Sequence, residues 1–467
     1  MTGRLFIDGE EVPGPRLAED AGALARALSR AGAGPGHGVV LGRDDAYTAV
    51  LTALAAESLG SPVLCQGERW RRMGCTRRVA AVVAPGAGGG PPAVTAVADD
   101  GRPVFSETAH TLLYTSGSSG EPKAVELSRG AIDYHRHTVA AHAGVGPGDR
   151  MLVPMSLLNS YGWGVVQYWL VHGFALHVES RLSMDRVAGL LRGGAFTTLD
   201  GVGSMYAALL TAAREDRDLA SALGGLRFRG CGGDVLPVSL VEGYVDVVGG
   251  PIHDGYGLSE TVAWVTQSVP DDWRPGTVGP LIKGSSARID PDTGEVHLRG
   301  PGLMDGYLDD PGANSDAFTG DGWLRTGDRG SLAGDGHLTV EGRIKESLVV
   351  HGETFPPRFV EDVMAACPAV REAAVVGVPT GKARGDRLVA FVVADPGHGE
   401  EALARVRAAL RDHLPVHLRP REIRLLDEFP RTRTDKPDRR ALRSSVAAGG
   451  APAAARRETA KSDTGNT

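Results

Sequence analysis

Short apolar segments alternate with helical segments over the first part of this 467-residue chain. The apolar residues of 17–32 fall on one helical stripe, and the apolar run 36–42 follows. A second helical segment, 46–60, leads into another apolar run at 61–65, and the same order returns at 150–179. This alternation predicts a layered α/β fold with a largely parallel sheet.

The residue pattern of the sequence changes twice further along the chain. After Gly279 the residues have strand–turn–strand character, with Asp292 at the turn, and the Gly/Pro-rich segment 83–103 predicts a surface loop. Past Gly342, short strands and one amphipathic helix predict a small α+β domain. We therefore predict three parts, namely a large N-terminal domain (1–342), a C-terminal domain (343–445) and a disordered tail (446–467).

Composition narrows the class of protein. Apolar residues make up 42% of the chain, which is enough for a sizeable core. The net charge of −7 is spread along the chain, which argues against binding of nucleic acid through bulk charge. Four cysteines without CxxC spacing suggest neither a zinc site nor a disulfide framework. The sequence has no signal-peptide pattern and no run of about 18 apolar residues, so we expect a cytoplasmic protein without a membrane span.

The stretch "YTSGSSGEPKAV", residues 114–125, follows an apolar strand and is rich in glycine and hydroxyl groups. Glycines let backbone N–H groups turn toward a ligand, hydroxyls add donors, and a lysine adds positive charge, so the stretch can cradle phosphate. It is not the Walker pattern, and by composition alone a flexible linker remains the alternative. The candidate residues are Thr115, Ser116, Gly117, Ser118, Ser119, Gly120 and Lys123.

This stretch resembles the phosphate loop of the adenylate-forming superfamily, which includes acyl- and aryl-CoA synthetases, adenylation domains of peptide synthetases, and luciferases. Ser119 stands where the family has threonine, and Ala124 stands where it has glycine. The resemblance implies an ATP- and acyl-binding N-terminal domain, built of layered α/β subdomains and a small β-barrel-like part. It also implies a small, mobile α+β C-terminal domain.

The stretch "HDGYGLSETV" resembles a second motif of the family. By this resemblance Tyr256 packs on adenine, Gly257 borders nucleotide and substrate, and Ser259 lies near the α-phosphate. Glu260 would hold Mg²⁺, because hard cations take carboxylate oxygen. The alternative is a helix cap, with Ser259 as an ordinary turn residue.

Two further stretches continue the resemblance toward the C-terminal domain. In "GDGWLRTGDRG" the residue Asp328 would accept hydrogen bonds from the ribose hydroxyls. In "EGRIKESLVVHGETF" the residue Arg343 would reach the ribose or phosphate, and Glu346 occupies the hinge position, where the family has Asp or Lys. The simpler alternative for Asp328 is a Thr-Gly-Asp turn.

The stretch "FPRTRTDKPDRRAL" resembles the family's lysine motif near the C-terminus. Lys436 would bridge the carboxylate and α-phosphate oxygens and stabilise the charge-rich transition state. Asp435 replaces the usual glycine and could hold the lysine elsewhere, and the alternative is a solvated basic turn. The motifs occur in the family's order, and the resemblance covers roughly residues 17–445.

Fewer residues of the sequence indicate the acyl pocket than indicate the nucleotide site. By resemblance, Gly232, Gly233 and Asp234 lie at a strand end that contacts adenine and substrate. Asn159 stands in a slot where relatives have a histidine or aromatic gate, and Asp200 stands in a usually apolar slot. Polar groups facing the pocket favour a substrate with its own donor, whereas a helix cap or turn is the alternative for Asp200. The sequence leans toward a small or aromatic polar carboxylic acid.

The resemblance implies attack of the acid on Mg·ATP to give acyl-AMP, followed by transfer to the thiol of CoA or of carrier-protein phosphopantetheine. Two other hypotheses stay open. One is an adenylating enzyme that uses an amine or another nitrogen nucleophile. The other is a binding protein whose chemistry has been silenced by Asp435 and the hinge change.

Overall fold

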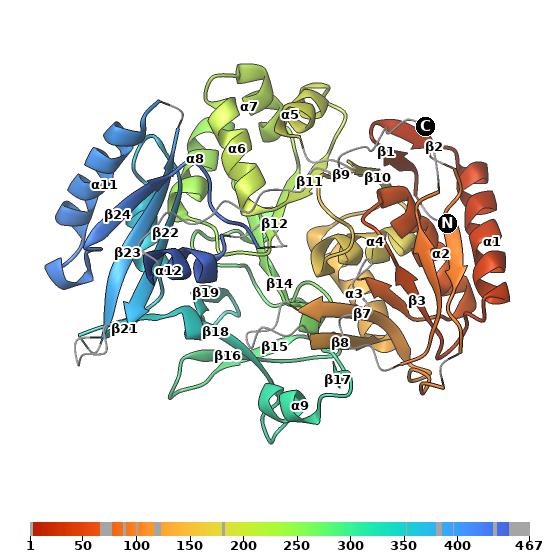
Figure 1. The fold of residues 1–467 in the computed structure, drawn as a ribbon. Coiled ribbons are helices and arrows are strands. Elements are labelled where there is room, and N and C mark those ends of the chain that lie inside the picture. The colour runs from red at the N-terminus through yellow and green to blue at the C-terminus, as the bar shows by residue number, and fades with distance from the viewer. Residues whose placement is uncertain are drawn as a thin grey trace, which may run out of the picture. The chain divides into compact units, whose positions relative to one another are not determined.

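The computed structural model describes residues 3–65, 77–86, 90–99, 101–115, 123–179, 183–351, 353–379, 385–395, 397–432 and 437–447 (Figure 1). Most of the chain up to Val340 forms one compact unit, and the chain from Glu341 onward forms a second. Within the described residues, no helix is long and apolar enough to cross a membrane.

The first unit contains an eight-stranded sheet in the order β14-β13-β12-β11-β9-β10-β1-β2. Its inner strands are parallel, and only the edge strands β2 and β14 pair antiparallel. The strands are β1 (Leu5–Ile7), β2 (Glu10–Val12), β9 (Arg150–Val153), β10 (Ala175–Val178), β11 (Thr198–Gly201), β12 (Phe228–Gly232), β13 (His253–Tyr256) and β14 (Thr266–Gln267). The predicted largely parallel sheet is confirmed.

A seven-stranded sheet in the order β17-β8-β7-β4-β3-β5-β6 belongs to the same unit. Its strands are β3 (Gly38–Leu41), β4 (Val63–Cys65), β5 (Val79–Ala84), β6 (Ala93–Ala96), β7 (Ala109–Thr115), β8 (Lys123–Ser128) and β17 (Gly306–Tyr307). Strand β6 lies inside the segment 83–103, which the sequence predicted as loop, so that prediction is wrong for these residues. The physical reason is that Ala93–Ala96 pairs with the edge of β5, a long-range contact that the surrounding glycines and prolines conceal.

Helices α2 and α4 are buried between layers rather than on the surface. Nearly every residue of α2 from Ala46 to Ala56 is buried, as expected for a helix that is apolar on all faces. One core joins residues of both sheets with α2, α3 and α4 and includes the fully buried Trp163 and Trp169. The helices before Val340 are α1 (Gly14–Arg30), α2 (Ala46–Leu59), α3 (Arg129–Ala143), α4 (Ser160–His172), α5 (Met184–Arg192), α6 (Gly203–Ala213), α7 (Arg217–Gly224), α8 (Val238–Val248) and α9 (Pro311–Ala317).

Local sequence signals set the ends of these buried helices. The Asp45 side chain accepts a hydrogen bond from the Thr48 N–H at the start of α2, and Ser128 does the same for α3. Gly60 and Gly144 follow the two helices in the left-handed conformation, at φ +64° and +63°. A second core gathers α5, α6 and α7 beside β11 and β12 (Figure 1).

A four-stranded sheet stands where the small β-barrel-like part was expected. Its order is β15-β16-β18-β19, with β15 (Ser286–Ile289), β16 (Glu295–Arg299), β18 (Leu324–Leu332) and β19 (Leu338–Arg343). The Asp290 carboxylate accepts hydrogen bonds from the backbone N–H and the hydroxyl of Thr293, which closes the turn before β16. The predicted strand–turn–strand is confirmed.

The second unit is a three-stranded sheet covered by helices on both faces. Along β22 and β23, alternate side chains pack against α10 and α11, and the intervening ones pack against α12. Its elements are β20 (Leu348–Val350), β21 (Glu353–Phe355), α10 (Arg358–Ala365), β22 (Val370–Pro379), β23 (Asp386–Ala394), α11 (Gly399–His413), β24 (Glu422–Leu426) and α12 (Arg439–Ala447). Helix α12 runs to Ala447, so the predicted start of the tail at residue 446 is two residues early. Residues 448–467 lie outside the described residues.

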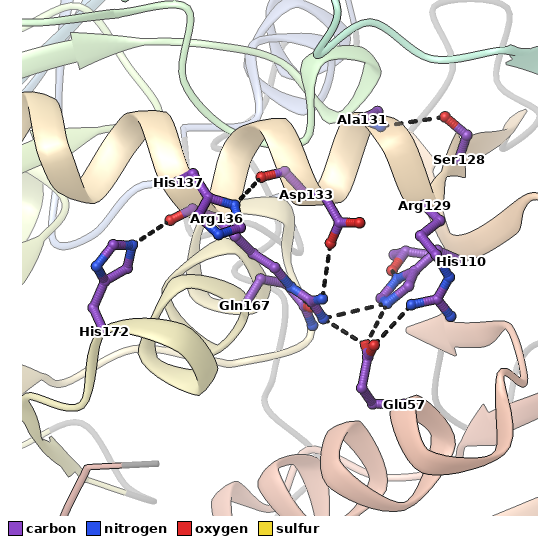
Figure 2. A network of polar contacts seen from close by, with 11 residues as sticks. Glu57, His110, Ser128, Arg129, Ala131, Asp133, Arg136, His137, Gln167 and His172 are labelled. Atoms are coloured by element: carbon purple, nitrogen blue, oxygen red, sulfur yellow. Dashed lines mark hydrogen bonds and ion pairs between the residues drawn. The ribbon is translucent and has the colours of Figure 1, made fainter. Parts of the chain in front are cut away.

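A polar network ties α2, β7, α3 and α4 together inside the first unit (Figure 2). The Glu57 carboxylate accepts hydrogen bonds from His110 Nε2 at 3.0 Å, Arg129 Nη1 at 2.7 Å and Arg136 Nη2 at 2.6 Å. Arg136 also donates to Gln167 Oε1 at 2.7 Å. Hydrogen bonds from His110 and Arg136 hold the pKa of Glu57 well below its usual range, so this carboxylate stays charged. The network fixes β7, whose last residue is Thr115.

We expect Arg136→Ala to lower the free energy of unfolding by about 1.5–3 kcal/mol, because the hydrogen bonds of the buried Arg136 to Glu57 and Gln167 are lost while Glu57 keeps Arg129 and His110. Urea denaturation measures the change. Arg192→Ala is the matched control, since the ion pair of Arg192 with Asp216 lies at the surface and contributes at most about 1 kcal/mol. Equal losses in the two variants would contradict the structural role assigned to the network.

Candidate active site

Strands β7 and β8 form the two arms of a hairpin at the predicted phosphate loop. Thr115, the last residue of β7, pairs directly with Lys123, the first residue of β8. The chain therefore enters and leaves the loop at one point, at the end of a buried strand. The loop residues Ser116, Gly117, Ser118, Ser119 and Gly120 lie outside the described residues, so their roles stay predictions.

Lys123 and Glu260 contact the same tyrosine. The Lys123 Nζ lies 4.8 Å from the centre of the Tyr307 ring, and the Tyr307 hydroxyl donates to Glu260 Oε1 at 2.7 Å. Tyr307 belongs to β17, which pairs with β8, whereas Glu260 lies in the 3₁₀ turn Ser259–Thr261. Through Tyr307, the structure thus connects the lysine of the predicted phosphate loop to the carboxylate predicted to hold Mg²⁺.

Tyr307 was not among the residues that the sequence predicted. It follows the stretch "GLMDG", which carries no charge pattern that would mark a ligand site. Only the pairing of β17 with β8 brings it to Lys123. A tyrosine hydroxyl that donates to a carboxylate fixes its orientation, so Tyr307 positions Glu260.

Tyr256 and Asp328 meet although they lie far apart in the sequence. The Tyr256 hydroxyl donates to Asp328 Oδ2 at 2.6 Å, and both side chains are buried. Tyr256 ends β13, and Asp328 lies within β18. The two residues predicted to contact the nucleoside therefore form one pair at the end of a parallel strand, where ligands of α/β sheets bind.

At two of the predicted site positions, Gly257 and Gly233, the backbone geometry favours glycine. A Cβ at Gly257 would lie 1.2 Å from the Ala263 carbonyl oxygen, so no larger residue fits there. Gly233 has φ +97°, a conformation that side chains rarely adopt. Its neighbour Asp234 is exposed, and its Oδ1 accepts from the Val235 N–H.

The structure separates the two polar substrate candidates. Asn159 is the N-cap of α4, and its Oδ1 accepts from the Gly162 N–H at 2.8 Å. Asp200 is neither a cap nor a turn, because it lies within β11 and is 3% exposed. The cap alternative considered for Asp200 therefore describes Asn159 instead.

Asp200 is a buried carboxyl group with one oxygen satisfied. The Tyr161 hydroxyl donates to Oδ1 at 2.8 Å, whereas Oδ2 has no hydrogen-bond partner among the described residues. Burial raises the pKa of Asp200 to about 6, although the hydrogen bond from Tyr161 opposes the rise.

Aromatic rings surround the Tyr161 end of this pair. The Trp264 ring meets the Tyr161 ring edge to face at 4.6 Å and stacks on the His135 ring at 5.5 Å. A Cβ at Gly232 would lie 3.4 Å from Tyr161 and 3.6 Å from Trp264 Nε1. The glycine at the end of β12 thus faces Tyr161 and Trp264, neither of which the sequence predicted as a site residue.

In the second unit, the predicted hinge and lysine segments have local partners. Glu346 forms an ion pair with Arg439 at 3.4 Å, and Arg343 is the last residue of β19. Arg431 forms a β-bridge with Pro437, which brings together the two ends of the segment that holds Lys436. Lys436 lies outside the described residues, so its role stays a prediction.

The residues around Glu260 fit a magnesium ion bound together with phosphate. Among the described residues, no three His, Cys, Asp or Glu side chains gather into a cluster that could hold a metal alone. Mg²⁺ in nucleotide sites is usually bound by one or two carboxylates plus phosphate oxygens. Glu260, oriented by Tyr307, supplies one such carboxylate.

Comparison with known proteins gives a consistent result. The family model of the AMP-binding enzyme matches residues 94–308, and the model of the AMP-binding enzyme C-terminal domain matches residues 360–436. A sulfoacetate–CoA ligase from Cupriavidus necator is 30% identical over 91% of this chain and 90% of that protein. A substituted indenylpropanoyl:CoA ligase from Mycobacterium tuberculosis is 33% identical over 77% of this chain and 70% of that protein.

A solved structure of similar fold is the amide bond synthetase McbA from Marinactinospora thermotolerans. It superposes with a TM-score of 0.80 at 27% identity, covering 96% of this chain and 97% of McbA.

The raised pKa of Asp200 predicts how the free energy of unfolding depends on pH. Its pKa is about 6 in the folded chain and 3.8 in the unfolded chain, so between these values the folded state binds more protons. Its contribution to stability therefore falls as pH rises through this window. We expect the free energy of unfolding of Asp200→Asn, relative to the unsubstituted protein, to rise by about 2 kcal/mol between pH 4 and pH 8.

Asp149→Asn is the matched control, measured by denaturation across the same pH range. Burial alone would raise the pKa of Asp149, but hydrogen bonds from Gly146, Thr197 and Arg227 outweigh it and lower the pKa. Asp149 is then ionised in both the folded and the unfolded chain over most of this range, so the difference curve of this variant should stay nearly flat. A flat difference curve for Asp200→Asn would show that the carboxyl group is not buried as described.

Proposed function

Because the chain belongs to the family of AMP-binding enzymes, we propose that it activates a small or aromatic polar carboxylic acid with ATP and transfers the acyl group to a thiol. The thiol is that of CoA or of a carrier-protein phosphopantetheine. The observation that carries the proposal is that Tyr307 contacts both Lys123 and Glu260. Glu260 lies only four positions after Tyr256, whose hydroxyl donates to Asp328. Phosphate, metal and nucleoside contacts then lie on adjoining segments of one unit.

In the first step, a carboxylate oxygen of the acid attacks the α-phosphorus of ATP, and pyrophosphate leaves. The loop between Thr115 and Lys123 holds the β- and γ-phosphates, and the Lys123 ammonium balances their charge. The buried Asp328 carboxylate accepts from the ribose hydroxyls. Mg²⁺ at Glu260 would neutralise charge on the phosphates, and Lys436 stabilises the charge that builds up at the α-phosphate.

In the second step, the thiol loses its proton to solvent, the thiolate sulfur attacks the acyl carbon, and AMP leaves with the electron pair of the broken C–O bond. Relatives named as CoA ligases support CoA as the acceptor. In this proposal the second unit rotates about Glu346 and replaces Lys436 with the segment around His351. The ion pair of Glu346 with Arg439 lies wholly within the second unit, so it can move with that unit as a rigid group.

A second candidate function uses a nitrogen nucleophile in place of the thiol. The similarity to an amide bond synthetase over nearly the whole chain supports it. Both functions share the first step, so only the acceptor distinguishes them.

A panel of carboxylic acids assayed for pyrophosphate release, with mass detection of products, tests the proposal. We expect acyl-AMP without an acceptor and an acyl thioester when CoA is added. Formation of an amide with added amines, and no thioester, would favour the second candidate. Absence of both pyrophosphate and acyl-AMP with every acid would overturn the proposed function.

We expect Lys436→Ala to slow acyl-AMP formation at least about 100-fold with little change in KM for ATP, because it removes charge stabilisation in the transition state. Lys283→Ala, which removes an exposed lysine of the first unit, is the matched control and should keep full activity. Acyl-AMP formation at the full rate by Lys436→Ala would refute the assigned role.

We also expect Tyr307→Phe to raise the Mg²⁺ concentration needed for half-maximal activity by about 10-fold, because Glu260 loses the hydrogen bond that orients it. Titration of Mg²⁺ at saturating ATP measures the shift. Tyr134→Phe, which removes a hydroxyl bonded to the Lys283 carbonyl, is the control and should show no shift.

A further inference from the structure

The Asp200 carboxyl group is not explained by the fold. Buried carboxylates are normally paired with a cation or fully hydrogen-bonded. The buried Asp149 carboxylate follows this rule, because it accepts hydrogen bonds from Gly146, Thr197 and Arg227. Asp200 has only the Tyr161 hydroxyl, and its Oδ2 is left without a partner among the described residues. A buried carboxyl group with an unpaired oxygen destabilises the fold, and a bound ligand that donates a hydrogen bond to this oxygen would remove that cost.

The position of Asp200 places it at the ligand-binding edge of the sheet. It lies one residue before the end of β11, which runs parallel to β9 and β12. Ligands of such sheets bind beyond the carboxyl ends of the strands. Strand β12 beside it ends at Gly232, the position predicted to contact the substrate.

Two glycines on one face of β12 let Asp200 and Tyr161 pack directly against the backbone of that strand. Gly230 and Gly232 are two residues apart, so they face the same side. A Cβ at Gly230 would lie 2.5 Å from Asp200 Oδ1, and one at Gly232 would contact Tyr161 and Trp264. Asp200, Tyr161 and Trp264 are therefore continuous along this face, which larger side chains on β12 would fill.

The unpaired groups around Trp264 are hydrogen-bond acceptors. His135 Nε2 lies 3.3 Å from the Gly164 carbonyl oxygen, which can only accept, so Nε2 carries the proton. Burial lowers the pKa of His135 to about 4, so the ring is neutral at pH 7 and its buried, unpartnered Nδ1 is an acceptor. The Tyr161 proton is already used toward Asp200. A ligand that satisfies this region must donate.

We propose that Asp200, held by Tyr161, is the group that recognises the substrate, and that it selects acids carrying an N–H or O–H donor at the end distant from the carboxyl group. The inference rests on the proposed function and specifies its substrate class. An amino or hydroxyl substituent donates to Asp200 Oδ2, while the carboxylate of the same acid points toward the nucleotide.

Matched acids test this proposal. The probes are benzoate and 3-phenylpropanoate, each compared with its ring-hydroxylated and ring-aminated derivatives, and the readout is kcat/KM for acyl-AMP formation. We expect the donor-bearing acids to be preferred over their parents, and the Asp200→Asn variant to lower this ratio at least about 10-fold. In Asp200→Asn, an NH₂ group replaces the carboxylate oxygen Oδ2. This NH₂ cannot accept a hydrogen bond from the donor of the substrate, whereas the shape of the side chain is unchanged. The hydroxyl and amino series show which donor is favoured.

Asp149→Asn makes the same chemical change at a buried aspartate bonded to Thr197 and Arg227. In this variant the ratio of kcat/KM between the donor-bearing acids and their parents should equal that of the unsubstituted enzyme. Tyr161→Phe provides a second variant should Asp200→Asn fail to fold, and it should also lower the ratio because Asp200 loses its positioning bond.

The outcomes separate this proposal from the proposed function. A ratio unchanged by Asp200→Asn or Tyr161→Phe overturns the recognition site and leaves acid activation intact. Preference for the unsubstituted parents has the same consequence. If no acid of any kind forms an adenylate, the proposed function fails at its first step and the recognition proposal fails with it.

Discussion

The position of β8 between β7 and β17 decides the geometry of the candidate site. On one side, pairing with β7 brings together Thr115 and Lys123, the two ends of the predicted phosphate loop. On the other side, pairing with β17 brings Tyr307 under the Lys123 ammonium and onto the Glu260 carboxylate. Backbone hydrogen bonds thereby place three residues from distant parts of the sequence side by side, and the Tyr307 side chain then contacts both Lys123 and Glu260.

Two carboxyl groups of the first unit, the half-buried Glu57 and the buried Asp200, have contrasting surroundings. Glu57 is surrounded by donors and stays charged, and its network fixes β7 against α2, α3 and α4. Asp200 has one donor, and burial raises its pKa. A fully satisfied network stabilises a fold, whereas a half-satisfied one costs stability and is typical of a site that awaits a ligand.

Several features were predictable because they depend on local patterns. The alternation of apolar strands and helices predicted the largely parallel eight-stranded sheet. Residues 111–115 were correctly predicted as a strand before the loop, and in the structure this strand begins at Ala109. Strand β6 was missed because its pairing with β5 is long-range. Tyr307, Tyr161 and Trp264 were missed for a related reason, since none carries a charge or spacing signal that separates a site residue from a core aromatic.

The sequence by itself determined the family resemblance, the order of the motifs and the residue types predicted to contact phosphate, because these depend on glycine, hydroxyl and charge at fixed spacing. Only the tertiary structure decided what the polar residues of the pocket do. It made Asn159 a helix cap and left Asp200 with an unpaired oxygen. The physical reason is that the role of a polar side chain is set by which donors and acceptors the fold places around it, and chain spacing does not carry that information.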